Sequence, residues 1–254
     1  MPPQPTHCAI CSSPFIPGQR YLIDWWGNVF CEKHLQEYPT CSACRRLVCQ
    51  RLTGGGVTYP DGRLMCQRCR ATAVDTKQQA KPVVEAIAPQ LYQWGLRFNG
   101  LILKIAVEDG LTIAQHHGQI DPNSRGQLLG YIGRTTERRG NQERRIVNGI
   151  TVLSGLPQEF FEGTVVHELG HAWLYLAKVD NLPRWQEEGF CNLLAYIYHK
   201  ERPTPEARWE VKRLEDDPDP IYGEGFRRVR ALFKKHGFGK ALNYTFYNRC
   251  FPPE

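Results

Sequence analysis

The chain has 254 residues, of which 41% are hydrophobic, and its formal net charge is +6 at pH 7. A chain of this length and apolar content can bury a substantial core, and its cysteine-rich start favours two domains rather than one. No apolar run reaches the roughly 18 residues that span a bilayer, which excludes a transmembrane protein.

The positive charge favours acidic partners, and many of the arginines lie in two groups. Such groups are more often solvated faces than nucleic-acid sites, so we expect no nucleic-acid partner. The first group is Arg45, Arg46, Arg51, Arg63, Arg68 and Arg70, and the second is Arg134, Arg138, Arg139, Arg144 and Arg145.

The first 70 residues contain zinc ligands at the spacing of structural zinc sites. Four soft ligands close the tetrahedron around a structural zinc ion. We therefore predict two structural Zn²⁺ sites, each built from two successive ligand pairs. The pairs are Cys8 and Cys11 with Cys31 and His34, and Cys41 and Cys44 with Cys66 and Cys69.

The alternative for these cysteines is a disulfide framework. No charged and then apolar signal peptide precedes Cys8, so export to an oxidising compartment has no support, and the cytoplasm is the expected location. Cys49, Cys191 and Cys250 fall outside the pairs, and we expect them to be ordinary thiols.

The double-zinc pattern resembles a LIM domain, with two departures. A LIM domain usually has a histidine before a cysteine in its second pair, and a very short spacer between its halves. Here Cys31 precedes His34, and six residues separate His34 from Cys41. We therefore describe residues 1–76 as a LIM-like domain.

The chain divides near residue 76, and a mixed pattern of helices and strands follows. A polar segment at 76–91 predicts a connecting helix that is broken around Pro82 and Pro89. Aliphatic runs predict strands at 101–107, 128–134 and 146–153, with an exposed turn at 137–145.

The residues His167 to His171 read His-Glu-Leu-Gly-His and carry the main chemistry of the chain. Residues i and i+4 of a helix share a face, so His167 and His171 can offer nitrogens to one metal ion while Glu168 sits beside it. This is the H-E-x-x-H arrangement of zinc proteases, in which the glutamate accepts a proton from water and passes it to the leaving amine.

We predict a helix at 157–176 around this motif. Pro157 suits a first-turn position, and no proline follows until Pro183. Apolar residues at three- and four-residue spacing predict one buried stripe, beside which the two histidines lie. The stripe is Phe161, Val165, Leu169, Ala172 and Leu176.

A catalytic zinc ion normally takes three protein ligands and keeps a fourth position for water. A second apolar segment opens at Trp185, and Glu187 and Glu188 both lie in the first turn of the helix that it predicts. Periodicity alone allows either carboxylate as the third ligand. Residues 185–190 resemble the W-x-x-E-G-F signature of gluzincin metallopeptidases, and this resemblance points to Glu188 as the ligand.

Further along, residues 222–226 resemble the gluzincin Y-x-x-G-F segment. The resemblance implies that the hydroxyl of Tyr222 donates to the oxyanion of the tetrahedral intermediate. Helices are predicted near 206–215, 225–236 and 240–247, with Gly237 as a stop. Strands before the metal helix and helices after it match the zincin plan.

The expected fold class is therefore α+β, with a zincin (gluzincin-like) metallopeptidase domain at 77–254 that follows the LIM-like domain. In the zincin plan an edge strand holds the backbone of an extended peptide, and we assign this role to 146–153.

Several motifs in one order resemble the DA-one family, which are LIM-containing, ubiquitin-activated peptidases known from plants. The motifs are residues 30–34, 73–76, 167–173, 187–189 and 222–227. The resemblance implies a zinc endopeptidase that acts on proteins, with ubiquitin or ubiquitylated proteins as further partners. At 254 residues the chain has no room for the ubiquitin-interacting motifs that plant members carry upstream. We therefore expect the LIM-like domain to select substrates, and basal cleavage to need no ubiquitin.

Two other functions fit part of the pattern. A SprT-like, DNA-associated repair protease also joins H-E-x-x-H to a zinc module and suits the positive charge, but such enzymes use a third histidine and place the zinc module after the catalytic domain. A LIM-like binding module on an inactive peptidase fold is the other alternative. The intact Glu168 argues against an inactive fold.

Overall fold

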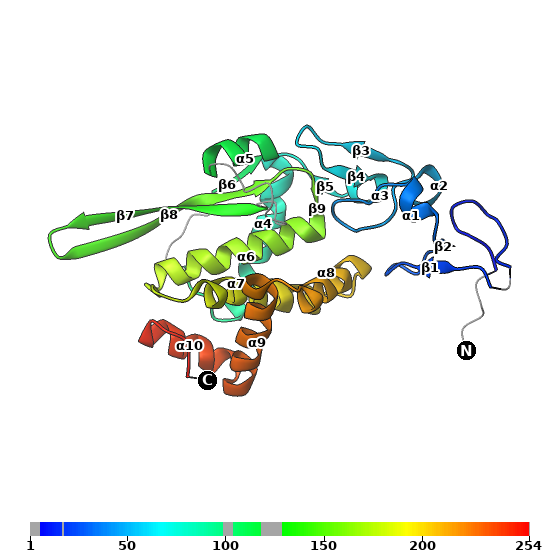
Figure 1. Ribbon diagram of the computed structural model, residues 1–254. Helices are drawn as coiled ribbons and strands as arrows, with labels where there is room; N and C mark the ends of the chain where they lie inside the picture. Colours follow the sequence, from blue (N-terminus) through cyan, green and yellow to red (C-terminus); the bar gives the residue numbers. More distant parts are fainter. Residues whose placement is uncertain (1–5, 17, 99–103, 118–128, 254) are drawn as a thin grey trace. The chain divides into compact units, whose positions relative to one another are not determined.

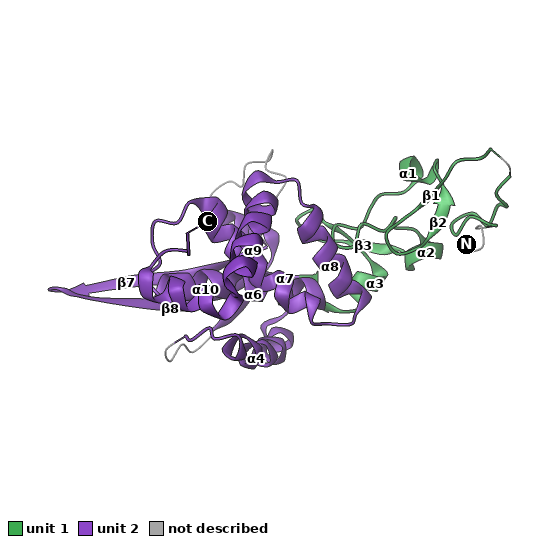
Figure 2. Cartoon of the chain, turned by 90° about the horizontal axis from the view of Figure 1, so that it is seen from below, with its two compact units in different colours: residues 1–73, 155–157 green, residues 74–154, 158–254 purple. Residues whose placement is uncertain are grey.

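The computed structural model describes residues 6–16, 18–98, 104–117 and 129–253 (Figure 1). These residues form two compact units of mixed helix and strand (Figure 2). Unit 1 consists of Met1–Ala73 together with Gly155–Pro157, and unit 2 consists of Val74–Ser154 together with Gln158–Glu254. The predicted α+β class is confirmed, and we describe each unit by itself.

Unit 1 is built from short elements. Its antiparallel hairpins are β1 with β2 and β3 with β4, and β5 pairs with β9. A cysteine that the spacing predicts as a zinc ligand ends the second strand of each hairpin, Cys31 in β2 and Cys66 in β4. The bounds are β1 Tyr21–Ile23, β2 Val29–Cys31, α1 His34–Glu37, α2 Gln50–Thr53, β3 Gly56–Thr58, β4 Leu64–Cys66, α3 Gln67–Arg70, β5 Ala73–Val74 and β9 Leu156–Pro157.

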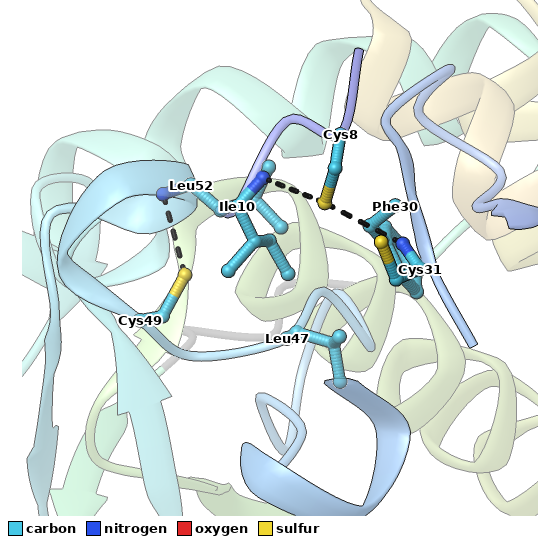
Figure 3. Close-up of a cluster of buried hydrophobic side chains, with 7 residues drawn as sticks. All are labelled: Cys8, Ile10, Phe30, Cys31, Leu47, Cys49 and Leu52. Atoms are coloured by element: carbon cyan, nitrogen blue, oxygen red, sulfur yellow. Dashed lines mark hydrogen bonds between the residues drawn. The ribbon is translucent and has the colours of Figure 1, made fainter. Parts of the chain in front are cut away.

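A small cluster of buried side chains includes two of the predicted zinc ligands, Cys8 and Cys31 (Figure 3). The backbone N–H groups of Ile10 and Cys31 both donate to Sγ of Cys8, at 3.4 Å each. Sγ of Cys49 accepts from the N–H of Leu52 at 3.4 Å and so caps α2. Cys49 is thus a packed, capping thiol. The cluster is Cys8, Ile10, Phe30, Cys31, Leu47, Cys49 and Leu52.

Unit 2 contains a three-stranded sheet in the order β6-β8-β7. The strands are β6 Ile105–Glu108, β7 Gly130–Arg139 and β8 Gln142–Leu153. β8 pairs parallel with β6 and antiparallel with β7, so the prediction that 146–153 forms the edge strand was wrong. The end of β8, from Ile150 to Leu153, is buried throughout, as expected for a central strand. Within the described residues, β7 is an edge strand of this sheet.

The predicted turn at 137–145 is instead the outer part of a long hairpin. β7 continues to Arg139 and β8 starts at Gln142, with Gly140 at a φ of +57° between them. Pairing opposes charges of unlike sign, Glu137 with Arg144 and Arg138 with Glu143, which stabilises exposed strands that carry no apolar face. The hairpin extends beyond the helices of unit 2 (Figure 1).

The described residues of unit 2 also form eight helical segments. α6 packs against β7 and β8 and also against α7, and α7 packs against α8, α9 and η1 (Figure 1). The bounds are α4 Lys77–Gln93, α5 Gly110–His117, α6 Gln158–Leu176, α7 Arg184–Lys200, α8 Pro205–Asp216, the π-helix η1 Pro220–Glu224, α9 Gly225–His236 and α10 Phe238–Asn248.

The helix around the histidine motif is confirmed, but its burial is broader than one stripe. α6 begins at Gln158, and Pro157 lies in β9 just before it. Most of its side chains are buried, because the sheet and other helices cover it on several sides, while Leu176 is only half-buried. α6 is therefore the central helix of unit 2.

α4 runs unbroken through Pro82 and Pro89, so the predicted break was wrong. Thr76 and Gln79 form a reciprocal capping box at its start. The buried face of the helix offsets the backbone hydrogen bonds that the prolines remove. That face is Ala80, Val84, Ile87 and Leu91.

The other expected elements of unit 2 differ mainly at their ends. The first residues of the expected strand at 101–107 and residue 128 of the expected strand at 128–134 lie outside the described residues. The helices predicted at 206–215, 225–236 and 240–247 are confirmed as α8, α9 and α10, and Gly237 ends α9 with a φ of +79°. No helix in the described ranges has the length and apolar character needed to cross a membrane.

Candidate active site and metal centres

The described cysteines and histidines of unit 1 gather as the spacing predicts. Each group brings four possible ligand atoms within 4.8 Å of one another. Cys8, Cys11, Cys31 and His34 form the first group, and Cys41, Cys44, Cys66 and Cys69 form the second.

The geometry of both groups fits zinc. Sγ of Cys11 lies 3.9 Å from Sγ of Cys31, and Sγ of Cys44 lies 3.7 Å from Sγ of Cys66. Two thiolates on one tetrahedral zinc ion lie about 3.8 Å apart, given a Zn–S bond of about 2.3 Å. All ten cysteines are free of disulfides. In the first group, Nε2 of His34 is buried without a hydrogen-bond partner, and a metal ion would bind its lone pair.

The electrostatics of the first group favour the thiolate form of Cys8 and Cys11, whereas burial raises the pKa of Cys31 to about 11. Burial would raise the pKa of Cys8, but backbone N–H groups that donate to its sulfur outweigh this effect and lower the pKa. The hydroxyl and backbone of Ser13 lower the pKa of Cys11 to about 5. Thiolate is the form in which cysteine binds zinc, so these hydrogen bonds prepare the group for metal.

A third group of ligands lies where α6 meets α7. Nε2 of His167 is 3.2 Å from Nε2 of His171. Oε2 of Glu188 is 3.2 Å from Nε2 of His167 and 3.5 Å from Nε2 of His171. Ligand atoms on a tetrahedral zinc ion with bonds of about 2.0–2.1 Å lie about 3.3 Å apart. The three atoms therefore form a triangle of the right size for zinc, with a fourth position open.

The other nitrogen of each histidine is held by a polar partner. Nδ1 of His167 lies 2.9 Å from Oδ1 of Asn192, and Nδ1 of His171 lies 3.0 Å from Oε1 of Glu187. An N–H on each Nδ1 donates to these oxygens, which leaves both Nε2 lone pairs directed at the metal position. The structure thus separates the two carboxylates that periodicity left open. Glu188 lies in the ligand triangle, and Glu187 lies behind His171.

The pKa shifts of the three carboxylates agree with their positions at the centre. Burial would raise the pKa of Glu188, but the two imidazoles of His167 and His171 beside it hold this pKa well below its usual range. The hydrogen bond from His171 also lowers the pKa of Glu187. Burial raises the pKa of the Glu168 carboxyl, which makes it a stronger proton acceptor than an exposed glutamate.

Tyr222 reaches the same centre from η1. The hydroxyl of Tyr222 donates to Oε1 of Glu188 at 3.4 Å and accepts from Nη2 of Arg184 at 3.2 Å. Asn192, whose Oδ1 holds His167, also donates from Nδ2 to the Tyr222 carbonyl at 3.0 Å. This hydrogen bond links η1 to α7. Burial raises the pKa of Tyr222, so its hydroxyl stays protonated and able to donate.

A cavity of about 350 Å³ in unit 2 contains all of the predicted centre. Its lining includes His167, Glu168, His171, Glu188 and Tyr222. The edge strand β7 supplies Gly130, Tyr131, Ile132 and Arg134. The expected ligands, proton acceptor and hydroxyl donor thus share one cleft, beside a strand that can pair with a peptide.

The thiol of Cys191 is a feature of this centre that the sequence analysis missed. It belongs to the same ligand group as His167 and His171. Cys191 is fully buried, and burial raises the pKa of its thiol to about 11, which disfavours a thiolate ligand. The available signal was helical spacing, because Cys191 and Asn192 lie three and four residues after Glu188 and share its face of α7.

The glycine of the predicted third-ligand motif has a packing reason. A Cβ on Gly189 would lie 2.5 Å from the carbonyl oxygen of Gly225, at the start of α9. A side chain there would push α7 and α9 apart, and with them Glu188 and Tyr222. The two glycines of the E-G-F and Y-x-x-G-F segments are therefore partners in one close helix contact.

Comparisons with known proteins agree with the motif pattern. A family model described as DA1-like, Protein DA1, matches residues 106–208. The LIM domain-containing protein HDR3 of Oryza sativa subsp. japonica is 23% identical over 96% of this chain and 62% of its own length. Protein DA1 of Arabidopsis thaliana is 24% identical over 96% of this chain and 56% of its own length.

Protein DA1-related 2 of the same plant is 24% identical, over 96% of this chain and 58% of its own length. The chain therefore spans about three fifths of the length of these three relatives. No solved structure matches it. The predicted resemblance to the DA1 family is confirmed.

Proposed function

Starting from this DA1-like character, we propose that the chain is a zinc-dependent endopeptidase that cleaves protein substrates. The observation that carries the proposal is the triangle of His167, His171 and Glu188 atoms, with spacings of 3.2 to 3.5 Å. Two imidazoles, one carboxylate and an open position are the ligand set of a catalytic zinc ion. In this proposal unit 2 has a zincin (gluzincin-like) fold, and unit 1 is a LIM-like domain with two structural zinc sites.

The roles of the chain's own residues follow from their positions. A zinc ion in the triangle would supply a Lewis acid that activates water and polarises the scissile carbonyl. Glu168 accepts the proton of the attacking water and passes it to the leaving amine. The hydroxyl of Tyr222 donates a hydrogen bond to the oxyanion that develops on the carbonyl. Asn192 and Glu187 fix the orientations of His167 and His171.

The free edge of β7 can form backbone hydrogen bonds with a substrate. β7 lines the cleft and has no further strand of the described sheet on its outer side. An extended peptide can therefore pair with it above the catalytic residues. We assign to the LIM-like unit the selection of protein substrates or partners, with ubiquitylated proteins among them, and we place the enzyme in a reducing compartment, the cytoplasm, because free zinc-ligand cysteines favour one.

The two alternative functions, a SprT-like repair protease and a non-catalytic binding module, require other features of the site. A SprT-like repair protease needs a third histidine ligand, whereas here a carboxylate completes the triangle. A non-catalytic binding module has no need for a buried glutamate such as Glu168 beside a possible metal site.

The test compares Glu168→Gln with the unchanged chain on unfolded protein substrates and on a fluorogenic peptide library. We expect the variant to keep its zinc and to lose at least about a hundredfold in kcat, the usual contribution of a positioned proton acceptor. Glu206→Gln, which removes an exposed carboxylate of α8, is the matched control and should retain activity. Equal cleavage by the unchanged chain and Glu168→Gln would overturn the proposal.

A further inference from the structure

Arg134 lies on β7 where two cavities of unit 2 share a wall. The first is the cleft with the three-ligand triangle, and Arg134 and Glu187 both line it. The second is a cavity of about 150 Å³, which Arg134 and Glu187 also line, together with Tyr175 and Asp180. A substrate held in the cleft would therefore pass the guanidinium of Arg134.

The charge of Arg134 is not neutralised by a salt bridge. Its guanidinium carbon lies 5.5 Å from the centre of the Tyr175 ring. No ion pair joins Arg134 to a carboxylate in the part of the chain that the structure describes. An aromatic ring supports a guanidinium without occupying its N–H groups, so these groups remain able to donate.

Arg145 contacts the same ring and shows the opposite situation. Its nitrogens lie 2.6 and 2.8 Å from the carboxylate of Asp180 and 2.8 Å from Oε1 of Glu143. It also donates to the Tyr175 carbonyl at 2.9 Å. The carboxylate of Asp180 is thus engaged by Arg145, and that of Glu187 by His171. Asp180 and Glu187, which line the smaller cavity together with Arg134, thus have partners of their own, and the N–H groups of Arg134 remain able to donate to a ligand.

The register of β7 relates Arg134 to the reacting bond. A Cβ on Gly130 would lie 3.1 Å from Cγ of Glu168, so the start of β7 runs directly past the proton acceptor. Arg134 follows four residues later, just past a register shift between Gly133 and Arg134, and so lies at most about 13 Å along the strand at ~3.3 Å per residue. Because the arginine side chain is long, it can reach a substrate position two to four residues from the scissile bond.

We propose that Arg134 is a specificity-determining residue that binds a carboxylate of the substrate, held two to four residues from the scissile bond. The planar guanidinium binds carboxylates through two parallel N–H···O hydrogen bonds, which neutral side chains cannot reproduce. The carboxylate comes from an aspartate or glutamate side chain, or from the C-terminus of a peptide. This inference rests on the proposed peptidase function.

The experiment uses the full zinc-loaded chain and a set of peptides of one length. Each peptide carries glutamate, glutamine or lysine at one position, and each is made with a free or an amidated C-terminus. We expect kcat/KM to be about tenfold or more higher for glutamate than for glutamine at one position, as for a charge-assisted hydrogen bond. Arg134→Gln should abolish this ratio, and Arg134→Glu should reverse it in favour of lysine.

Arg138→Glu is the matched control, because it makes the same charge change on the same strand. Arg138 is highly exposed, does not line the cleft, and pairs only loosely with Glu143 at 3.5 Å. This control should keep the preference for glutamate. Loss of the preference in Arg138→Glu to the same extent as in Arg134→Glu would mean that net charge alone is responsible, and would overturn the subsite.

A binding measurement separates this inference from the proposed function. Fluorescence anisotropy with Glu168→Gln protein reports the affinity of labelled glutamate and glutamine peptides without cleavage. If the unchanged chain cleaves nothing, yet Arg134→Gln removes a preference in binding, the peptidase function fails and the subsite stands. If the unchanged chain binds and cleaves glutamate and glutamine peptides alike, with either C-terminus, the subsite is overturned.

Discussion

Two neighbouring glutamates on α7 contact opposite nitrogens of the same histidine. Glu188 lies 3.5 Å from Nε2 of His171, and Glu187 lies 3.0 Å from Nδ1 of that ring. One carboxylate can therefore bind a metal ion while the other fixes the ring that binds it. The next two predictions concern single side chains at this centre.

Replacing Glu188 by alanine should remove one zinc ion per chain and all peptidase activity, because the triangle loses its only charged ligand. Glu187→Ala should retain the metal, with an affinity lower by about tenfold to a hundredfold, the usual effect of losing an outer hydrogen bond. Zinc content after dialysis against a graded chelator measures both. Zinc loss confined to Glu187→Ala would reverse the two assignments.

Tyr222→Phe should keep the fold and the zinc content and lower kcat by roughly a hundredfold, because one donor to the oxyanion is lost. KM should change little, since the hydroxyl acts mainly on the charged intermediate. Tyr247→Phe, which changes an exposed tyrosine of α10, is the control. Full activity of Tyr222→Phe would make Tyr222 a packed aromatic side chain only.

Sequence spacing predicts the residues of this centre that helical geometry alone brings together. His167, His171 and Glu168 share one helix, and the turn that bears Glu188 is recognisable from its own motif. Asn192, Cys191 and Arg134 could not be assigned, because their roles depend on which face of α7 or β7 meets α6. Packing between elements decides which face is in contact, and the spacing of residues in the sequence indicates it only weakly.

At the scale of elements, charge and burial explain why three segments differ from their sequence-based predictions. The segment 137–145 is polar, and polar runs usually indicate a turn, yet cross-strand pairs such as Glu137 with Arg144 keep it in a hairpin. The burial of β8 shows only in three dimensions, because β6 joins its other edge from a distant part of the sequence. α4 tolerates two prolines for the same reason, since tertiary packing outweighs local propensity.

Among the described glycines of unit 1, Gly155 is the one at which an added methyl group would meet the closest neighbour. Its φ is +79°, and a Cβ would lie 2.4 Å from ring atoms of Tyr59. Gly155→Ala should therefore destabilise unit 1 by about 3 kcal/mol, from backbone strain together with a clash that displaces β9. Chelator-induced zinc release, followed with a coloured indicator, should be faster in this variant.

Gly62→Ala is the control for backbone strain, because Gly62 has a similar φ of +85° but no atom within 4 Å of its Cβ position. It should cost only about 1 kcal/mol. Equal zinc-release rates for the two variants would show that Tyr59 does not restrain β9.

At the scale of the whole molecule, the eleven predicted ligands divide into two groups of four in unit 1 and one of three in unit 2. We predict three zinc ions per chain, two in closed sites and one in an open site. Elemental analysis after gentle purification should give this ratio, and a brief chelator treatment should remove the ion of the open site first. A ratio that stays at two while His167 and His171 are intact would contradict the catalytic assignment.

The strand β9 has a consequence for how this protein can be divided. Residues 155–157 belong to unit 1, although the sequence on both sides of them belongs to unit 2. The backbone therefore crosses between the units at three points, after residues 73, 154 and 157. Removing residues 1–73 would leave β9 without the rest of its unit, one residue before the helix that carries His167. An exchange of unit 1 between two such chains therefore has to carry residues 155–157 along with residues 1–73.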